Sequence, residues 1–197
     1  MELKFRCSHC NRKLEADATL AGSVLSCPSC NQDVTVPPVH LGRDVTLGGF
    51  RIERLLGRGA MGEVFLANQL SMNRLVALKV LPGRLVSDSD FVERFFQETR
   101  LAAKLQHPNI VAAYDAGMDH GYYYFAMAYV EGEALEQRLK RQGALSEREA
   151  LAIATDVADA LAYAWDHGRI MHRDIKPSNI MLSASGNAMI MDMGIAK

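Results

Sequence analysis

Apolar and polar positions alternate with two different spacings along residues 50–197. In the first half, short apolar or β-branched runs separated by Gly-rich or polar residues predict strands, at 51–56, 63–68, 75–81, 110–116 and 122–130. Asp119-His120-Gly121 lies between the last two runs and is typical of a hairpin turn. Strands are therefore expected to gather in the first half of this region.

Helical spacing of apolar residues takes over in the second half, after one earlier helix. Residues 87–90 offer several N-caps for that first helix, and a His-Pro-Asn sequence at 107–109 ends it. A second helix is predicted over 133–141. A capping box at Ser146 begins a longer one, which ends near Gly168. This order of elements indicates an α+β fold.

All four cysteines lie within the first 30 residues, as two Cys-x2-Cys pairs formed by Cys7, Cys10, Cys27 and Cys30. Four thiolates at this spacing are typical of a tetrahedral structural zinc site. So small a module buries too little apolar surface to fold alone, so metal ligation would supply most of its stability. Two disulfides are the alternative, disfavoured because no signal peptide precedes them.

The cysteine region resembles the short zinc ribbons found at the N-termini of some bacterial proteins. We therefore predict a zinc-ribbon module over residues 1–36, followed by a linker over 37–49 that contains two prolines and three glycines. Basic residues in the module suggest contact with nucleic acid, but acidic residues lie among them, which favours a generic docking module.

Charge and hydropathy exclude several classes of protein. The net charge of −1, from 22 basic and 23 acidic residues, gives no bulk attraction to nucleic acid or an anionic membrane. The longest apolar stretch, 151–165, is interrupted by Asp156 and Asp159, which excludes a membrane span there. We expect a cytoplasmic chain, with membrane anchoring of a longer parent protein as the alternative.

A glycine-rich segment, Gly57-x-Gly59-x-x-Gly62-x-Val64, follows the first predicted strand. Glycines let the backbone approach phosphates closely and present N–H groups to them. The spacing alone also fits a dinucleotide-binding fold. That fold, however, opens a helix within the glycines, whereas here a second strand follows, so a hairpin lid over a nucleotide is predicted.

A lysine and a glutamate follow this segment in order. Val-Ala-Leu-Lys at 76–79 places Lys79 on a strand, and Glu98 lies on the next helix. Pairing the two would aim the ammonium group at nucleotide phosphates. The alternative is an ordinary surface lysine and a solvated helix charge. Glu93 is a rival partner on a different face of the helix, and the order and spacing favour Glu98.

The most informative segment is His172-Arg173-Asp174-x-Lys176-x-x-Asn179, followed by Asp192-Met193-Gly194. Phosphoryl transfer needs a carboxylate near the attacking hydroxyl, a cation on the migrating phosphate and oxygen ligands for magnesium. We predict Asp174 as the base, Lys176 as the cation, and Asn179 with Asp192 as magnesium ligands. His172 is predicted to pack in the core.

With these motifs in order, residues 50–197 resemble the protein kinase family. Lys176, two positions after the predicted base, resembles the serine/threonine branch. Met-Gly-Glu-Val at 61–64 and His-Pro-Asn-Ile-Val at 107–111 further resemble bacterial kinases of the eukaryotic type. The resemblance implies a bilobal fold with a five-stranded antiparallel sheet and a helix in the N-lobe. It also implies transfer of the ATP γ-phosphoryl group, with Mg²⁺, to Ser or Thr hydroxyls of a protein substrate.

The same resemblance implies an apolar adenine slot. Its residues would be Val64 and Ala77 above the ring, Met181 below it, Met127 as gatekeeper, and the backbone of Ala128 and Val130. Leu56 is also expected to bind the nucleotide. Gly57, Gly59, Gly62 and Lys79 would hold the phosphates. Simple core packing is the alternative for the apolar members, because Met fills irregular gaps.

Two departures from the family pattern affect the prediction. Met193 replaces the usual Phe of Asp-Phe-Gly, a swap of similar volume that leaves metal binding by Asp192 intact. No activation segment and no later large-lobe helices are found up to Lys197, so we expect a kinase domain that stops after Asp-Met-Gly. The alternative function is a catalytically inactive module that docks a partner through its nucleotide or its zinc ribbon.

Overall fold

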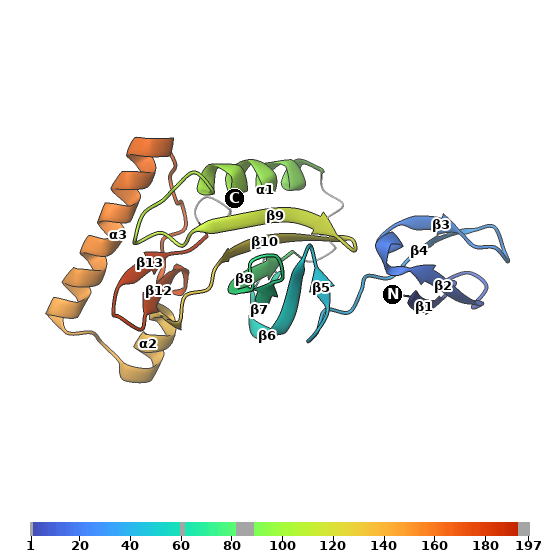
Figure 1. The fold of residues 1–197 in the computed structure, drawn as a ribbon, viewed down its shortest axis with the longest axis horizontal. Coiled ribbons are helices and arrows are strands. Elements are labelled where there is room, and N and C mark those ends of the chain that lie inside the picture. Colours follow the sequence, from blue (N-terminus) through green and yellow to red (C-terminus); the bar gives the residue numbers. More distant parts are fainter. Residues whose placement is uncertain (1, 60–61, 82–88, 193–197) are drawn as a thin grey trace. The chain divides into compact units, whose positions relative to one another are not determined.

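The chain forms two compact units in the computed structural model, which describes residues 2–59, 62–81 and 89–192 (Figure 1). Unit 1 comprises Met1–Val92 with Ala116–Phe125, and unit 2 comprises Glu93–Asp115 with Ala126–Lys197. Across the described ranges, no helix combines the length and apolar character needed to cross a membrane.

The cysteine region of unit 1 consists of two small antiparallel hairpins. The first pairs β1 (Glu2–Arg6) with β2 (Lys13–Asp17), and the second pairs β3 (Val24–Ser26) with β4 (Asp33–Thr35). A 3-10 helix, η1 (Ala18–Leu20), connects them. Asn11 and Asn31 close the two cysteine turns with φ of 59° and 54°, a left-handed conformation that Asn tolerates better than most residues.

A six-stranded sheet follows in the order β5-β6-β7-β8-β10-β9. Its strands are β5 (Thr46–Leu47), β6 (Phe50–Gly59), β7 (Gly62–Gln69), β8 (Arg74–Val80), β9 (Ala113–Asp119) and β10 (Tyr122–Ala128). Five strands were expected. The sixth, β5, forms because Asp44 N–H and Val45 C=O both bond to the Ile52 backbone at 2.8 Å, which extends the pairing with β6 into the region predicted as linker.

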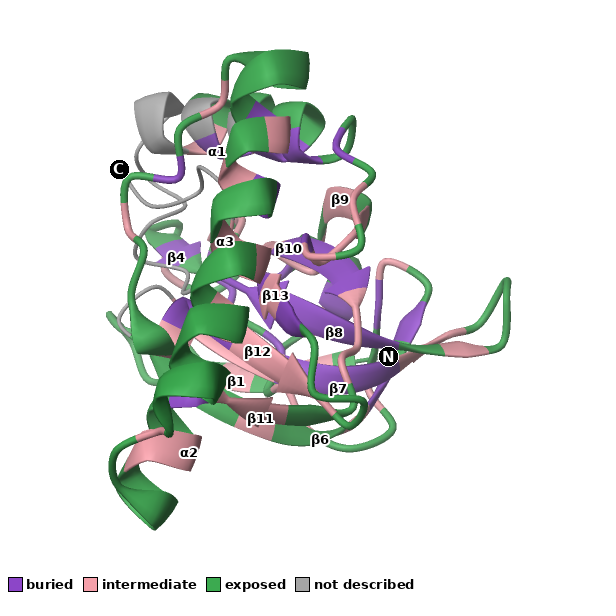
Figure 2. Cartoon of the chain, turned by 90° about the vertical axis from the view of Figure 1, so that its left-hand side faces the viewer, coloured by how far each residue is buried: buried purple, intermediate pink, exposed green. Residues whose placement is uncertain are grey.

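Burial across the sheet follows from strand position. On β6, Phe50 and Ile52 are buried and alternate with Arg51, which is exposed, as expected when one face of a strand is covered. On β8 the run from Val76 to Val80 is buried without interruption, because this strand lies inside the sheet and is covered on both faces. Figure 2 shows β8 in purple.

The helices are α1 (Ser89–Ala102), α2 (Leu135–Gln142) and α3 (Glu147–Gly168). Unit 2 also holds a small sheet, β11-β12-β13, from Gly132–Ala134, Ile180–Ser183 and Ala188–Ile190, and a 3-10 helix, η3 (Pro177–Asn179). These three short strands carry no strong alternation and were not predicted. The α+β class predicted from the sequence is confirmed.

The long helix α3 begins at the predicted capping box. The Ser146 Oγ accepts from the Glu149 N–H at 3.3 Å, and the Glu149 carboxylate accepts from the Ser146 N–H at 3.2 Å. One face of α3 is fully buried at Ala160 and Ala164. Another exposes Leu151 and the single tryptophan, Trp165, and much of α3 is green in Figure 2.

Candidate phosphoryl-transfer site

The glycine-rich segment is a hairpin, as predicted. Strands β6 and β7 pair with Gly57 opposite Val64 and Gly59 opposite Gly62. The three glycines differ in their surroundings. Gly62 has φ of 131°, and a Cβ there would lie 2.1 Å from the Val80 carbonyl oxygen, whereas a Cβ at Gly57 or Gly59 would meet no described atom within 4 Å. The packing of the described residues therefore requires glycine at 62 but not at 57 or 59.

Strand register places several predicted nucleotide-binding residues on one face of the sheet. Val64 on β7 lies opposite Lys79 on β8, and Ala77 lies two positions from Lys79, so the three side chains point to the same side. Lys79 is only 6% exposed. Glu98 belongs to α1, but its side chain lies outside the described part of the structure, so its pairing with Lys79 remains a prediction.

Asp174 is the centre of a polar cluster on the loop before η3. The Lys176 ammonium donates to Asp174 Oδ2 at 2.7 Å. The Asn179 amide donates to the same oxygen at 3.1 Å and to the Asp174 carbonyl at 2.9 Å. The hydrogen bond from Lys176 lowers the pKa of Asp174, so the carboxylate is ionised at neutral pH. No hydrogen bond from a described residue reaches Oδ1, which leaves this oxygen able to accept a proton.

His172 holds the loop in place and is 2% exposed. Its Nδ1 accepts from the Asp174 N–H at 3.3 Å, and its Nε2 lies 2.8 Å from the Met191 carbonyl. Because a carbonyl can only accept, Nε2 is the nitrogen that donates to Met191. Its position agrees with the predicted core role, since it joins the loop of Asp174 to the segment before Asp192.

The β12–β13 hairpin brings the two predicted magnesium ligands to the same end of a strand pair. Its register runs from Leu182 opposite Ala188 to Ile180 opposite Ile190. Beyond it the Met191 N–H donates to the Asn179 carbonyl at 2.9 Å. Asp192 follows directly, so it is adjacent to Asn179 in this register. Met193 and Gly194 lie outside the described residues.

Two positioning residues were not predicted from the sequence. The Asn109 side-chain amide donates to the Ala188 carbonyl at 2.8 Å, and the Asp156 carboxylate accepts from the Ala188 N–H at 2.8 Å. Together they satisfy both polar groups of the Ala188 backbone on β13, the strand that leads to Asp192. Asn109 had been noted only within a family-like motif, and Asp156 only as a charge interrupting an apolar run.

The remaining adenine-slot residues occupy strand and hinge positions. Leu56 is half-buried on β6, and Met127, at 5% exposure, lies near the end of β10. Ala128 donates its N–H to the Ala112 carbonyl at 2.8 Å, and Val130 follows it. Met181 on β12 pairs with Met189 and with Ala134. Their contacts with adenine remain a prediction.

The four cysteines of unit 1 converge on one point. All four Sγ atoms lie within 4.8 Å of one another, and the Cys7–Cys30 and Cys10–Cys27 pairs are 3.7 and 3.8 Å apart. Four sulfurs at the usual Zn–S distance from one ion would be about 3.8 Å apart. All four are free thiols rather than disulfides. The cluster is therefore compatible with zinc.

Hydrogen bonds give these thiols different pKa values. The backbone N–H groups of Ser29 and Cys30 lower the pKa of Cys27 to about 6. At Cys30 the Gln32 N–H favours the thiolate, but burial and the hydrogen bonds that the Cys30 thiol donates to neighbouring cysteines outweigh it and raise the pKa to about 12. Without metal the four sulfurs share protons, and a cation would replace those protons.

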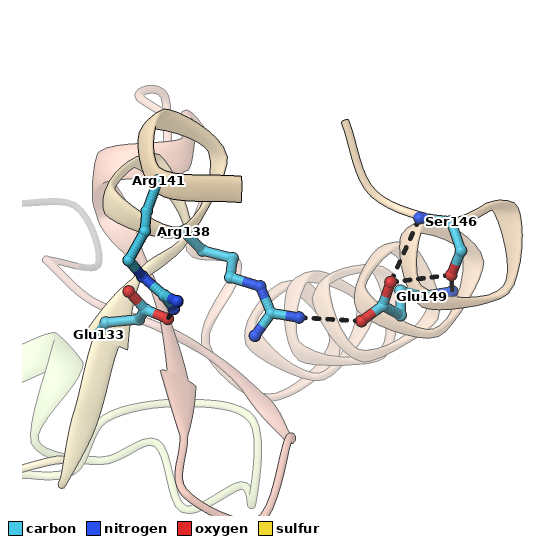
Figure 3. A network of polar contacts seen from close by, with 5 residues as sticks. All are labelled: Glu133, Arg138, Arg141, Ser146 and Glu149. Atoms are coloured by element: carbon cyan, nitrogen blue, oxygen red, sulfur yellow. Dashed lines mark hydrogen bonds and ion pairs between the residues drawn. The ribbon is translucent and has the colours of Figure 1, made fainter. Parts of the chain in front are cut away.

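A cavity of about 480 Å³ lies in unit 2, and none of the predicted site residues is among those that line it. It is lined by Gly132, Glu133, Arg138, Arg141, Leu145, Glu149, Ala152, Ile153, Leu182, Ser183, Ala184 and Gly186. Figure 3 shows that its arginines are paired: Arg138 with Glu149 at 3.0 Å, and Arg141 with Glu133. These pairs balance the charge of its wall, and we assign it no role in phosphoryl transfer.

Comparisons with known proteins agree with this geometry. The serine/threonine-protein kinase PrkC of Bacillus subtilis is 41% identical over 149 residues, which are 76% of this chain and 23% of that protein. The serine/threonine-protein kinase PknJ of Mycobacterium tuberculosis is 44% identical over 153 residues, 76% of this chain and 26% of that protein. The chain thus spans about a quarter of the length of the curated relatives it matches.

The crystal structure of the Mycobacterium tuberculosis PknI kinase domain superposes with a TM-score of 0.72 at 41% identity, covering 80% of this chain and 63% of that one. A double mutant of the same domain gives 0.74 at 38% identity, covering 80% and 65%. The family model described as the protein kinase domain matches residues 50–197. These matches confirm the predicted kinase-like fold, and the chain belongs to the protein kinase family, among the eukaryotic-type bacterial serine/threonine kinases.

Proposed function

We propose that this chain carries the nucleotide-binding and catalytic-loop part of a serine/threonine protein kinase, which transfers the γ-phosphoryl group of ATP to a protein Ser or Thr hydroxyl. The observation that carries the proposal is the cluster at Asp174. Lys176 and Asn179 both bond to Oδ2, so Oδ1 is oriented for a substrate hydroxyl. The family implies ATP and Mg²⁺ as its partners in the reaction.

The roles divide as follows. Asp174 accepts the proton of the attacking hydroxyl. Lys176, which is hydrogen-bonded to the Asp174 carboxylate, supplies the positive charge that stabilises the migrating phosphoryl group. Lys79, paired with Glu98, is assigned to the phosphates of ATP. The backbone N–H groups around Gly57 and Gly59 are assigned to the same phosphates, because a Cβ at either position would meet no atom of the described residues within 4 Å.

Asn179 and Asp192 fit a magnesium ion by the chemistry of their atoms. The Asn179 amide nitrogen is already used in donating to Asp174, so its oxygen is the atom left for a cation. Asp192 supplies a carboxylate at the same end of the β12–β13 hairpin. Oxygen ligands of this kind suit Mg²⁺, which when bound would neutralise charge on the ATP phosphates.

The test is transfer of labelled phosphate from ATP to a Ser- and Thr-containing protein substrate. Asp174→Asn is expected to lower the rate by about 10²-fold or more, because it removes the base. Asp159→Asn, an exposed change on α3, is the matched control and should leave the rate unchanged. Activity that survives Asp174→Asn combined with Lys79→Met would refute the assignment. Calorimetric ATP binding without transfer would instead support the inactive docking module.

We also propose that Cys7, Cys10, Cys27 and Cys30 bind one structural Zn²⁺. The support is the spacing of their sulfurs and the absence of disulfides among them. Free thiols of this kind persist in a reducing cytoplasm, where we place the protein. Elemental analysis should find one zinc per chain, and a chain with Cys27→Ser should lose it. A full complement of free thiols with no bound metal would contradict the site.

A further inference from the structure

The zinc-ribbon module and the linker that follows it share a second apolar cluster, besides the one around the cysteines. Ala18, Ala21 and Val39 are all at most 5% exposed, and the partly buried Leu3 and Val45 pack against them. The remaining member is Tyr122, the first residue of β10 in the kinase sheet. The ribbon therefore packs part of its apolar surface against a residue that lies far along the chain.

Three contacts at the β9–β10 turn add specificity to this packing. The Tyr122 hydroxyl donates to the Val39 carbonyl at 2.6 Å. The Nδ1–H of His120 donates to the Ala18 carbonyl at 3.1 Å. Gly121 fits so closely that a Cβ there would lie 2.6 Å from the Ala21 carbonyl oxygen. His120 is thus bonded to the backbone of the ribbon, and Tyr122 to the backbone of the linker that follows it.

The backbone of the turn is shaped for this contact. His120 and Gly121 both have positive φ, 50° and 76°, which turns the chain tightly between β9 and β10. Burial also raises the pKa of Tyr122. If the ribbon moved away, the half-buried Tyr122 hydroxyl and the carbonyl that it bonds at 2.6 Å would both lose their hydrogen-bond partner.

The ribbon side of this surface depends on the cysteine turns for its shape. Ala18 and Ala21 lie on the connection between the two Cys-x2-Cys pairs, and Val39 follows the second pair. The connection is tied back to the end of the second hairpin, because the Gly22 N–H donates to the Val36 carbonyl at 3.0 Å. The cysteine cluster of Cys7, Cys27 and Val34 is small, so loss of metal would leave little to hold these segments together.

We propose that the ribbon docks on the β9–β10 turn through this surface, and that metal binding at the four cysteines is coupled to ordering of that turn. The proposal rests on the zinc site proposed above but not on kinase activity. By thermodynamic reciprocity, if bound zinc favours docking of the turn by some factor, then docking of the turn favours zinc binding by the same factor. A substitution that undocks the turn must therefore weaken zinc binding. Strand β10 runs on from Tyr122 to Met127 and Ala128, so the coupled element includes the predicted gatekeeper.

Two glycines provide a matched test. Gly121 and Gly186 both lie in hairpin turns with positive φ, 76° and 88°, so replacing either with Ala strains the backbone similarly. A Cβ at Gly121 meets the ribbon, whereas one at Gly186 meets no described atom within 4 Å. In chelator competition on the whole chain, we expect Gly121→Ala to weaken Zn²⁺ binding by about 5-fold or more and Gly186→Ala by less than about 2-fold.

Hydrogen exchange measures the reciprocal effect. Amides of residues 113–125 should exchange about 5-fold faster or more after Zn²⁺ is removed, while those of 180–190 stay unchanged. Tyr122→Phe, which deletes only the hydroxyl, should shift exchange and zinc affinity in the same direction and serves if Gly121→Ala does not fold.

Equal zinc affinities for the two glycine variants, or zinc-independent exchange of 113–125 while residues 2–36 respond to zinc, would overturn the coupling. A chain that binds no zinc at all overturns the zinc site itself and is recognised separately by its metal content. Loss of phosphoryl transfer does not enter either measurement, so a failure of the kinase assignment is distinguishable from a failure of this proposal.

Discussion

The three glycines of the β6–β7 hairpin should respond very differently to the same substitution. In Gly62→Ala the new methyl group would lie 2.1 Å from the Val80 carbonyl oxygen and 3.3 Å from the Leu81 Cα, and the backbone would keep φ of 131°. Neither obstacle is a flexible side chain, so β7 or β8 must move. In Gly59→Ala the methyl group meets no described atom within 4 Å.

The structure gives the size of the difference. A side chain in a sparsely populated backbone region costs about 1–3 kcal/mol, and overpacking against fixed backbone costs about 1–3 kcal/mol more. Gly62→Ala should therefore lower the free energy of unfolding by roughly 2–6 kcal/mol. Gly59→Ala carries neither cost and reduces the freedom of the unfolded chain, so it should change stability by no more than about 1 kcal/mol, in the stabilising direction.

Two assays separate stability from ligand binding. Urea unfolding followed by far-UV circular dichroism measures the first, and calorimetry with a non-hydrolysable ATP analogue and Mg²⁺ measures the second. Gly59→Ala should fold normally yet bind the analogue more weakly, because its methyl group occupies the space through which phosphates approach the backbone. Equal destabilisation by the two substitutions, or unchanged nucleotide affinity in Gly59→Ala, would refute this division of roles.

Three further predictions concern unit 2. Asp156→Ala leaves the Ala188 N–H without its carboxylate and should cost about 1–3 kcal/mol in urea unfolding followed by tryptophan fluorescence; no loss would show that water replaces the bond. Asn109→Ala removes the bond to the carbonyl of the same residue, Ala188, and faster hydrogen exchange at 188–192 is expected, with exchange of α2 as the control. Ser146→Ala removes the cap of α3 and should cost about 1 kcal/mol at pH 7. Because the hydrogen bond from Ser146 lowers the pKa of Glu149, this stabilisation is complete above the ordinary carboxyl pKa and is lost as the pH falls through the lowered value. The stability gap between Ser146→Ala and the parent should therefore narrow in acid, and a constant gap would contradict the capping box.

Local patterns predicted the elements that local chemistry determines. The capping box at Ser146 and the turn at His120 and Gly121 are confirmed, because each depends on a few adjacent residues. The main strands were found for the same reason. Strands β11, β12 and β13 were missed, since each has only three or four residues and its stability comes from pairing with segments distant in sequence.

The candidate site shows the same division. Residue type and order along the chain were enough to select Asp174, Lys176 and Asn179, and the structure brings these three together. The residues that support the site could not be selected from the sequence in this way. Asn109 and Asp156 act on the Ala188 backbone across 79 and 32 residues, and no short sequence pattern encodes such a contact.

The two cysteine turns repeat one design. In each, the carbonyl of the first cysteine accepts from the N–H of the Asn four residues later in the chain. The N–H of the same cysteine donates to the carbonyl of the residue that follows this Asn. In each, the first thiol, Cys7 or Cys27, is buried, while the second, Cys10 or Cys30, is more accessible. Alkylation of the metal-free ribbon should therefore begin at Cys10, which is exposed, while the buried Cys7 is protected until its turn opens. At the second turn the lowered pKa of Cys27 and the raised pKa of Cys30 oppose the difference in accessibility, so the two turns should not react alike.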